Sequence, residues 1–245
     1  MGTGRLGRSV TDSAARRGRA SGDGGPWIDP TDRLVGILGG TFDPIHFGHL
    51  LIAEQVRETL RLDRVLFVPA AAPPHKLNEI LAPAADRAAM VKLAISDNMR
   101  FAISEIELGR PGPSYTADTL AELADEATRQ GVARGFFFIL SVEALAGLKK
   151  WHEPARLLEL SRLAVVARPG APMPSSPSLG ALLPGGAASL ARVDCVETSL
   201  VAHSSSAVRA RVAAGRSIRY LVPPSVEAYI RDHRLYRSDN SMRTA

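Results

Sequence analysis

The sequence contains little cysteine and few aromatic residues. Cys195 is the one cysteine among 245 residues, so the chain cannot form an internal disulfide, and we expect it to work in a reducing cytoplasm. No apolar run approaches the roughly 20 residues that span a bilayer, so we expect no membrane partner. Aromatic residues make up 5% of the chain and no dense block of Lys and Arg is present, so we expect no nucleic-acid partner. The net charge of +5 suits polyanionic nucleotides.

The first 32 residues have almost no large apolar side chains and are rich in Gly, Ser and Arg. So few apolar groups cannot offset the entropy lost on ordering, which predicts a disordered basic tail over residues 1–32. We predict one domain over residues 33–236 and a C-terminal tail over 237–245. Within the domain, residues 171–188 are rich in Pro, Ser and Gly, which predicts a mobile loop or insertion.

The most informative pattern begins at residues 34–38, a short apolar run that ends in the pair Gly39-Gly40. This pattern is typical of a buried strand that enters a tight turn. After a short loop the chain has helical periodicity, and His46 and His49 lie where that helix begins. The two imidazoles are therefore one turn apart on the same side of the helix.

These residues predict a phosphate site. The first turn of a helix has free N–H groups and the positive end of the dipole, both of which favour bound phosphate. Gly39 and Gly40 have no Cβ, so a polyphosphate could approach the backbone closely. A His-x-x-His pair is also found as surface histidines or as metal ligands. A metal site needs a third protein ligand, and no Cys or other His lies nearby in sequence, so we expect no protein-held metal.

Further apolar or alternating runs predict strands at residues 64–69, 101–108, 135–140, 162–167 and 192–196. Helical patterns separate most of these runs. The alternation predicts a doubly wound α/β domain with a parallel sheet and a small helical C-terminal part. Ligands of such sheets collect beyond the carboxyl ends of the strands.

A second group of phosphate-binding residue types lies near the C-terminus. Ser204, Ser205 and Ser206 precede a helical stretch, and Arg209 lies one turn into it. Hydroxyls and N–H groups at a helix start, with a guanidinium nearby, could clamp an anion. A serine N-cap with solvated arginines explains the same residues, so the pattern alone leaves both readings open.

The string GGTFDPIHFGHL at residues 39–50 resembles the signature of the nucleotidyltransferase superfamily that carries the His-x-Gly-His motif. More narrowly, it is similar to that of the bacterial nicotinate-nucleotide adenylyltransferase family. The resemblance covers roughly residues 33–236 in at least four motifs. It implies a Rossmann-like nucleotidyltransferase fold and adenylyl transfer from ATP to nicotinate mononucleotide. The products would be nicotinate adenine dinucleotide and pyrophosphate, as in NAD biosynthesis.

The resemblance also implies roles for individual residues. His46 and His49 would contact the reacting phosphates as catalytic residues, and the protein would hold no metal because Mg²⁺ would arrive with ATP. The residues implied to bind ATP and its phosphates are Gly39, Gly40, Thr41, Phe42, Lys76, Arg168, Ser204, Ser205, Ser206 and Arg209.

Residues 114–120 resemble the Ser-Tyr-Thr-x-Asp-Thr-Leu segment that lines the family's pyridine pocket, although Ser114 could simply cap the helix that follows. The residues implied to bind the pyridine mononucleotide are Tyr115, Thr116, Glu143 and Trp151. The chain departs from the family at Ser141 and Glu143, where Gly and Asp are usual. Backbone N–H groups near Thr116 would favour the carboxylate of nicotinate over the amide of nicotinamide.

Other functions remain open at this point. Related nucleotidyltransferases act on nicotinamide mononucleotide or phosphopantetheine, or transfer cytidylyl groups. The His-x-Gly-His loop also occurs in class I aminoacyl-tRNA synthetases, so a non-catalytic nucleotide- or RNA-binding module is a further alternative. The sequence admits a homo-oligomer and does not decide the oligomeric state.

Overall fold

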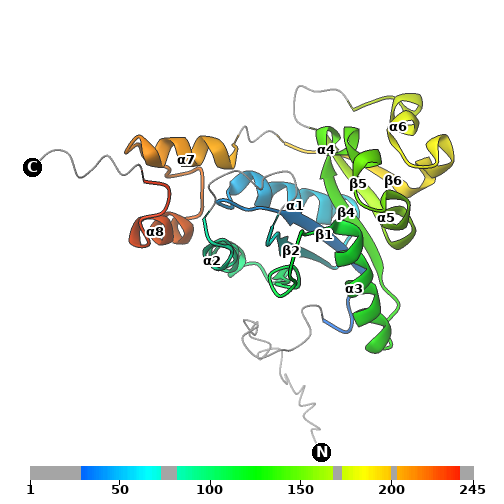
Figure 1. Cartoon of the computed structure of the whole chain (residues 1–245), viewed down its shortest axis with the longest axis horizontal. Helices are drawn as coiled ribbons and strands as arrows, with labels where there is room; N and C mark the ends of the chain where they lie inside the picture. The colour runs from blue at the N-terminus through cyan, green and yellow to red at the C-terminus, as the bar shows by residue number, and fades with distance from the viewer. Residues whose placement is uncertain (1–28, 73–81, 168–172, 200–202, 238–245) are drawn as a thin grey trace, which may run out of the picture.

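A computed structural model describes residues 29–72, 82–167, 173–199 and 203–237. Over these ranges the chain forms a six-stranded parallel sheet in the order β3-β2-β1-β4-β5-β6, with helices on both faces (Figure 1). The strands are β1 (Leu34–Gly40), β2 (Arg64–Pro69), β3 (Phe101–Ile103), β4 (Gly135–Ser141), β5 (Arg162–Ala167) and β6 (Val193–Glu197). The expected doubly wound α/β fold is confirmed.

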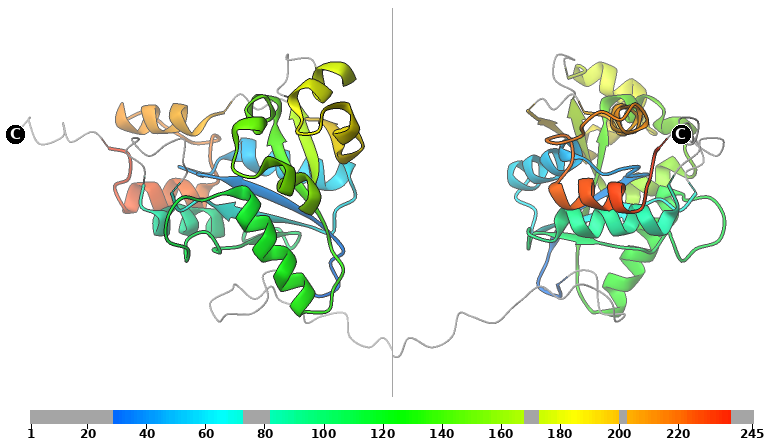
Figure 2. Two further views of the ribbon diagram at one scale, coloured as in Figure 1. Left: turned by 45° about the vertical axis from the view of Figure 1, so that its right-hand side comes forward. Right: turned by 90° about the vertical axis from the view of Figure 1, so that its left-hand side faces the viewer.

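Two groups of helices cover the two faces of the sheet (Figure 2). One face packs against α1 (Phe47–Thr59), α2 (Ala84–Ile95), α7 (Ser205–Ala213) and α8 (Pro224–Asp232). The other packs against α3 (Thr116–Arg129), α4 (Val142–Ala146), η1 (Leu148–Lys150), α5 (Pro154–Leu160) and α6 (Ser176–Leu182), with η2 (Gly186–Arg192) beside α6. None of the described helices is long and apolar enough to cross a membrane.

The strands have continuous apolar runs because both of their faces are buried. In β2, Val65 and Phe67 belong to the core under α1 and α2, while Leu66 and Val68 belong to the core on the opposite face. Successive side chains of a strand point to opposite faces, so a central strand needs an apolar residue at every position.

The strand order reverses direction between β1 and β4. From β1 the chain adds β2 and β3 on one side, then crosses to the other side to add β4, β5 and β6. The two central strands are thus followed by loops that leave in opposite directions, which is where doubly wound sheets bind ligands. The segments that follow β1 and β4 carry His46, His49, Glu143 and Trp151 among the residues predicted to bind substrates.

The fully buried side chain of Arg87 on α2 holds the loops at this end of the sheet together. Its guanidinium donates to the carbonyl oxygens of Thr41 and Ala70, each at 2.7 Å, and to that of Ala71 at 3.2 Å. Its Nε donates to the carbonyl oxygen of Ala82 at 3.0 Å. One buried charged group therefore binds four carbonyls from three chain segments.

The structure differs from expectation at residues 171–188. Of these, residues 171 and 172 lie outside the described part, and the remainder holds α6 and the start of η2 in place of a mobile loop. Leu179 and Leu183 have helical spacing and are buried in the core under α3 and α5. The composition suggested a loop because the spacing of two leucines is a weak signal among many Pro, Ser and Gly residues.

The strand expected over residues 101–108 is also shorter, because β3 ends at Ile103. The chain turns after it: the N–H of Leu108 donates to the carbonyl oxygen of Glu105 at 2.9 Å. The buried carboxylate of Glu107 accepts a hydrogen bond from the Thr119 hydroxyl of α3 at 2.7 Å. The alternating pattern therefore continues past the point where the backbone leaves the sheet.

The domain also begins earlier than the expected boundary at residue 33. Asp32 is buried and accepts from Arg64 Nε on β2 at 2.7 Å. Arg134 donates to the carbonyl oxygens of Asp29 at 3.1 Å and Asp32 at 3.3 Å. Residues 29–32 thus pack against the domain, while the predicted tail over residues 1–28 lies outside the described residues.

Replacing Asp32 with Ala should lower the melting temperature. Arg64 would lose a charge-assisted hydrogen bond in a mostly buried position, at a cost of about 2 kcal/mol, or roughly 4–8 °C for a domain of this size. Deleting residues 1–28 should leave the melting temperature unchanged. Scanning calorimetry of both variants beside the full chain measures this, and a large drop for the deletion alone would contradict the revised boundary.

Candidate active site

Two imidazoles begin α1 directly after the β1 loop. His46 caps the helix, and its backbone N–H donates to Nδ1 of His49 at 3.2 Å. The two rings stack with their centroids 3.8 Å apart and an interplanar angle of 26°. Because Nδ1 of His49 accepts this bond, the proton of the neutral ring resides on Nε2, where it can be donated to a ligand.

The glycine between the histidines is required by packing. A Cβ on Gly48 would lie 2.9 Å from both Cε1 and Nδ1 of His46, closer than such atoms come in proteins. Gly40 has a related role, since its Cβ would lie 3.1 Å from the ring of Phe42. At Gly39 a Cβ would meet only Phe138, at 3.7 Å, so the space beside Gly39 remains open to a ligand.

Both histidines are held neutral by their surroundings. Burial, with a smaller contribution from His203, lowers the pKa of His46 to about 4. Burial and then the neighbouring His46 lower the pKa of His49 well below its usual value. Nδ1 of His46 is buried and has no hydrogen-bond partner among the described residues. Such an unpaired polar atom is costly in the free protein, and a bound ligand could satisfy it.

The loop that leads to these histidines is held by the packing of Phe42 and by a hydrogen bond from Arg87 to Thr41. Phe42 has a left-handed backbone with φ of 48°, and its ring meets that of His49 edge to face at 5.1 Å. The Phe42 side chain is buried, so only its backbone can face a nucleotide. The carbonyl oxygen of Thr41 is bound by Arg87, and Thr41 itself is half-buried.

The start of α7 is joined to this loop. Ser205 Oγ donates to the carbonyl oxygen of Pro44 at 2.9 Å, and Arg209 Nη1 donates to that of Asp43 at 2.8 Å. Arg209 Nη2 donates to Ser206 Oγ at 3.3 Å. Ser204 caps the helix, its hydroxyl accepting from the N–H of Ala207 at 3.1 Å. The N-termini of α1 and α7 therefore meet at one place, as the two predicted phosphate motifs require.

The structure shows the capping interpretation of the serine cluster, and the anion clamp stays a prediction. Ser204 is the N-cap, whereas Arg209 is not a solvated arginine, because its guanidinium is held against the β1 loop. His203, which precedes the cluster, was not predicted as a site residue. Its carbonyl oxygen would lie 3.8 Å from a Cβ on Gly48, so it adjoins the His-x-Gly-His turn.

The predicted pyridine side lies at the start of α3 and after β4. Ser114 does not cap α3: its hydroxyl accepts from the N–H of Ala71 at 3.1 Å and so joins this turn to the β2 loop. Tyr115 occupies the N-cap position without a side-chain cap, which leaves the first-turn N–H groups of α3 without that partner. Thr116 begins the helix and is half-buried.

Two aromatic contacts frame this side. Tyr115 stacks on His152 with ring centroids 4.3 Å apart, and Trp151 meets Phe138 of β4 edge to face at 6.0 Å. Trp151 is half-buried, so part of its ring remains accessible. His152 was missed from the sequence, although its position beside Trp151 could have indicated it.

Ser141 and Glu143 stand where the family usually has Gly and Asp, and the backbone accommodates both residues. Ser141 caps α4, its hydroxyl accepting from the N–H of Ala144 at 3.2 Å, with an ordinary extended φ of −79°. A glycine is therefore not required there by the backbone. Glu143 is exposed in the first turn of α4. Lys76 and Arg168, both predicted to bind ATP phosphates, lie outside the described residues.

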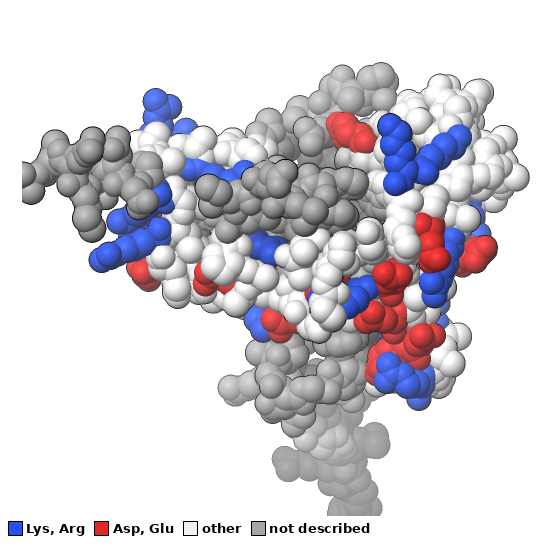
Figure 3. All heavy atoms as spheres, in the orientation of Figure 1, with Lys and Arg blue, Asp and Glu red and all other residues white. Residues whose placement is uncertain are grey.

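Charge is unevenly distributed over the surface. On the face shown in Figure 3, basic side chains gather around α7 and α8, whereas acidic side chains gather around α3. Within the described residues, one group has the spacing of metal ligands: Asp118, His152 and Glu153, beside Tyr115. None of its members belongs to the loop that carries His46 and His49.

The lowered pKa of His46 predicts a stability that depends on pH. Unfolding raises this pKa from about 4 to its ordinary value of 6.5, so the unfolded chain binds more protons between these values. The stabilisation that arises from the lowered pKa of His46 is therefore fully present above pH 6.5 and is lost as the pH falls toward 4. From pH 7 to pH 5 the wild type should lose about 2 kcal/mol more than His46→Asn in urea unfolding. Identical losses would show that His46 is not buried in its neutral form.

Comparisons with known proteins show the family of this chain. A model of the cytidylyltransferase-like family matches residues 37–211. A probable nicotinate-nucleotide adenylyltransferase of Roseiflexus sp. (strain RS-1) is 48% identical over 203 residues, covering 83% of this chain and 98% of the relative. One from Thermus thermophilus is 46% identical, covering 83% of this chain and 99% of the relative.

Solved structures support the fold. A Plasmodium falciparum nicotinic acid mononucleotide adenylyltransferase complexed with NaAD superposes with a TM-score of 0.67 at 17% identity, covering 83% of this chain and 97% of that one. At this identity the likeness shows the fold alone. The family follows from the sequence matches: the chain belongs to the cytidylyltransferase-like family and, within it, to the nicotinate-nucleotide adenylyltransferases.

Proposed function

We propose that this protein transfers the adenylyl group of ATP to nicotinate mononucleotide. An oxygen of the mononucleotide 5′-phosphate attacks the α-phosphorus of ATP, and the bond from that phosphorus to the bridging oxygen of the β-phosphate breaks. The products are nicotinate adenine dinucleotide and pyrophosphate. The observation that carries this proposal is the meeting of two helix N-termini, those of α1 and α7, around His46, His49 and Arg209.

The chemistry needs no protein nucleophile, because the attacking phosphate is already an anion. Catalysis then depends on holding the two phosphates in line and stabilising the charge that develops. His49 would donate from Nε2 to a phosphate oxygen, and His46, whose ring stacks on that of His49, would contact the same phosphates. Anionic phosphates would raise the depressed pKa of both rings, so either ring could take up a proton as the substrates bind.

The triphosphate of ATP would lie between the β1 loop and the start of α7. Arg209 supplies the positive charge, Ser206 a hydroxyl, and the first turns of both helices their N–H groups. Ser204 and Ser205 act mainly through the backbone, since their hydroxyls already bind Ala207 and Pro44. Lys76 and Arg168 remain predicted contributors on this side.

Mg²⁺ would be bound through ATP. The carboxylate of the phosphate loop, Asp43, is fully buried and already bonded to Ala82 and Tyr236, so the loop offers no free carboxylate ligand. Phosphate oxygens of ATP would supply the ligands in its place. When bound, the ion neutralises charge on the pyrophosphate leaving group.

The pyridine ring would lie between the start of α3 and the segment after β4. Trp151 and Tyr115 offer aromatic surface, and Thr116 opens a helix whose first-turn N–H groups lack a side-chain cap. These donors suit the carboxylate of nicotinate, whereas the NH₂ of nicotinamide would face other donors. Glu143 is exposed on α4 and would lie toward the ribose.

We expect a preference for nicotinate mononucleotide over nicotinamide mononucleotide, and one competition assay measures it. With both mononucleotides at equal concentration and ATP limiting, the acid dinucleotide should exceed the amide dinucleotide by roughly tenfold or more, the effect of one mismatched polar contact. Glu143→Ala is the matched control and should keep this preference. An excess of the amide product, or turnover only with phosphopantetheine or CTP, would overturn the proposed substrate.

A further inference from the structure

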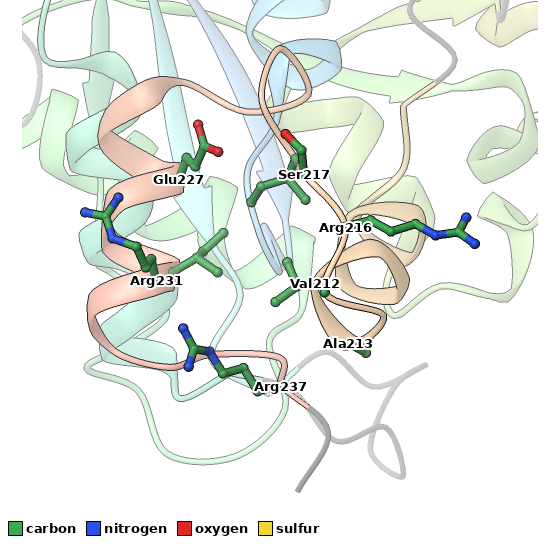
Figure 4. A pocket seen from close by; sticks show the side chains of 10 residues that line it. Val212, Ala213, Arg216, Ser217, Glu227, Arg231 and Arg237 are labelled. Carbon is green, nitrogen blue, oxygen red and sulfur yellow. The ribbon is translucent and has the colours of Figure 1, made fainter. Parts of the chain in front are cut away.

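The segment after α8 reaches back to the phosphate loop. Tyr236 lies four residues beyond the end of α8, and its hydroxyl donates to Oδ1 of Asp43 at 2.7 Å. Residue 43 belongs to the turn between Phe42 and His46, so this bond joins residues 193 positions apart in the chain. The next residue, Arg237, lines the hollow of about 550 Å³ between α7 and α8, together with Val212 and Arg231 (Figure 4).

Asp43 is almost wholly buried, with 1% of its surface exposed. Oδ1 accepts two hydrogen bonds, from Tyr236 and from the N–H of Ala82 at 3.1 Å. Oδ2 has no hydrogen-bond partner among the described residues, but Arg209 Nη1 lies 3.5 Å from it. The carboxylate is thus held through one oxygen and faces the guanidinium of Arg209 with the other.

Arg209 is bound to the same residue twice. Its Nη1 donates to the Asp43 carbonyl oxygen at 2.8 Å and pairs with the Asp43 carboxylate, while Nη2 reaches Ser206 Oγ at 3.3 Å. The position of this guanidinium over the start of α7 therefore depends on the position of Asp43. A buried carboxylate keeps its place and its charge only while donors satisfy it.

Tyr236 is suited to be such a donor. Burial and the bond to Asp43 raise the pKa of its hydroxyl, so the group stays protonated and continues to donate. Its backbone has φ of 61°, a left-handed conformation that a residue with a Cβ adopts at an energetic cost. The chain keeps this conformation while directing the phenol at the phosphate loop.

We infer that Tyr236 is a positioning residue for adenylyl transfer, which holds the carboxylate of Asp43 so that Asp43 in turn orients Arg209 toward the triphosphate of ATP. This inference rests on the proposed function for the identity of the ligand at Arg209. The C-terminal segment thereby takes part in ATP binding. The binding of the pyridine mononucleotide, near α3, should depend little on Tyr236.

The protein contains a matched control for a purely structural role. Tyr229 on α8 donates to Asp86 Oδ1 of α2 at 2.8 Å, so it too is a tyrosine that joins the C-terminal part to the domain through a carboxylate. Neither Tyr229 nor Asp86 contacts the phosphate loop in any hydrogen bond or ion pair among the described residues. Tyr229→Phe removes the same kind of bond without touching Asp43.

The test compares Tyr236→Phe with Tyr229→Phe. For Tyr236→Phe we expect the KM for ATP to rise roughly tenfold, as for the loss of one hydrogen bond to a charged group, with the KM for the mononucleotide nearly unchanged. For Tyr229→Phe both KM values should stay near wild type, even if its melting temperature falls as far. Equal effects of the two substitutions on the KM for ATP would overturn the inference.

A double-mutant cycle decides whether Tyr236 acts through Arg209. In an Arg209→Ala background, Tyr236→Phe should cause little further loss of affinity for Mg²⁺–ATP, measured by calorimetry without any acceptor. A full additional tenfold loss would contradict the coupling. Because this titration needs no acceptor, it remains valid if the acceptor proves not to be nicotinate mononucleotide, which the competition assay reports separately.

Discussion

The buried guanidinium of Arg87 is the interaction on which the nucleotide end of this fold depends. It binds four carbonyl oxygens, from Thr41 after β1, from Ala70 and Ala71 after β2, and from Ala82 before α2. The guanidinium thus gives these carbonyls a partner at the place where the loops have left the sheet. With the loops held this way, the chain reaches His46 in a fixed position.

Hydrogen bonds between segments also hold the helices at the site. Polar side chains that look available in the sequence are already partly used to join segments: Ser205 and Arg209 bind carbonyls of the β1 loop, and Ser114 binds an N–H after β2. What these bonds leave for a substrate is the N–H groups of helix starts, two imidazoles and the positive charge of Arg209. A rigid site of this kind stabilises charge in the transition state with little reorganisation.

Local patterns in the sequence predicted much of the fold and of the site, because they depend on neighbours. The apolar runs marked the strands, and Gly39, Gly40, His46 and His49 marked the turn from β1 into α1. Residues whose roles arise from distant contacts were missed: Arg87 and Tyr236 have nothing in their own surroundings that indicates the loop they meet. The interpretation of Ser114 as a cap of α3 was wrong for the same reason, since its partner lies 43 positions away in the chain.

We expect His46, His49 and Arg209 to promote direct transfer between phosphates, without a covalent adenylyl-enzyme. The most direct measurement is the stereochemical course with ATP made chiral at the α-phosphorus by isotopic or sulfur substitution. A single in-line displacement predicts inversion of configuration in the dinucleotide product. Retention would require two displacements and an adenylylated residue such as His49, which would contradict the account.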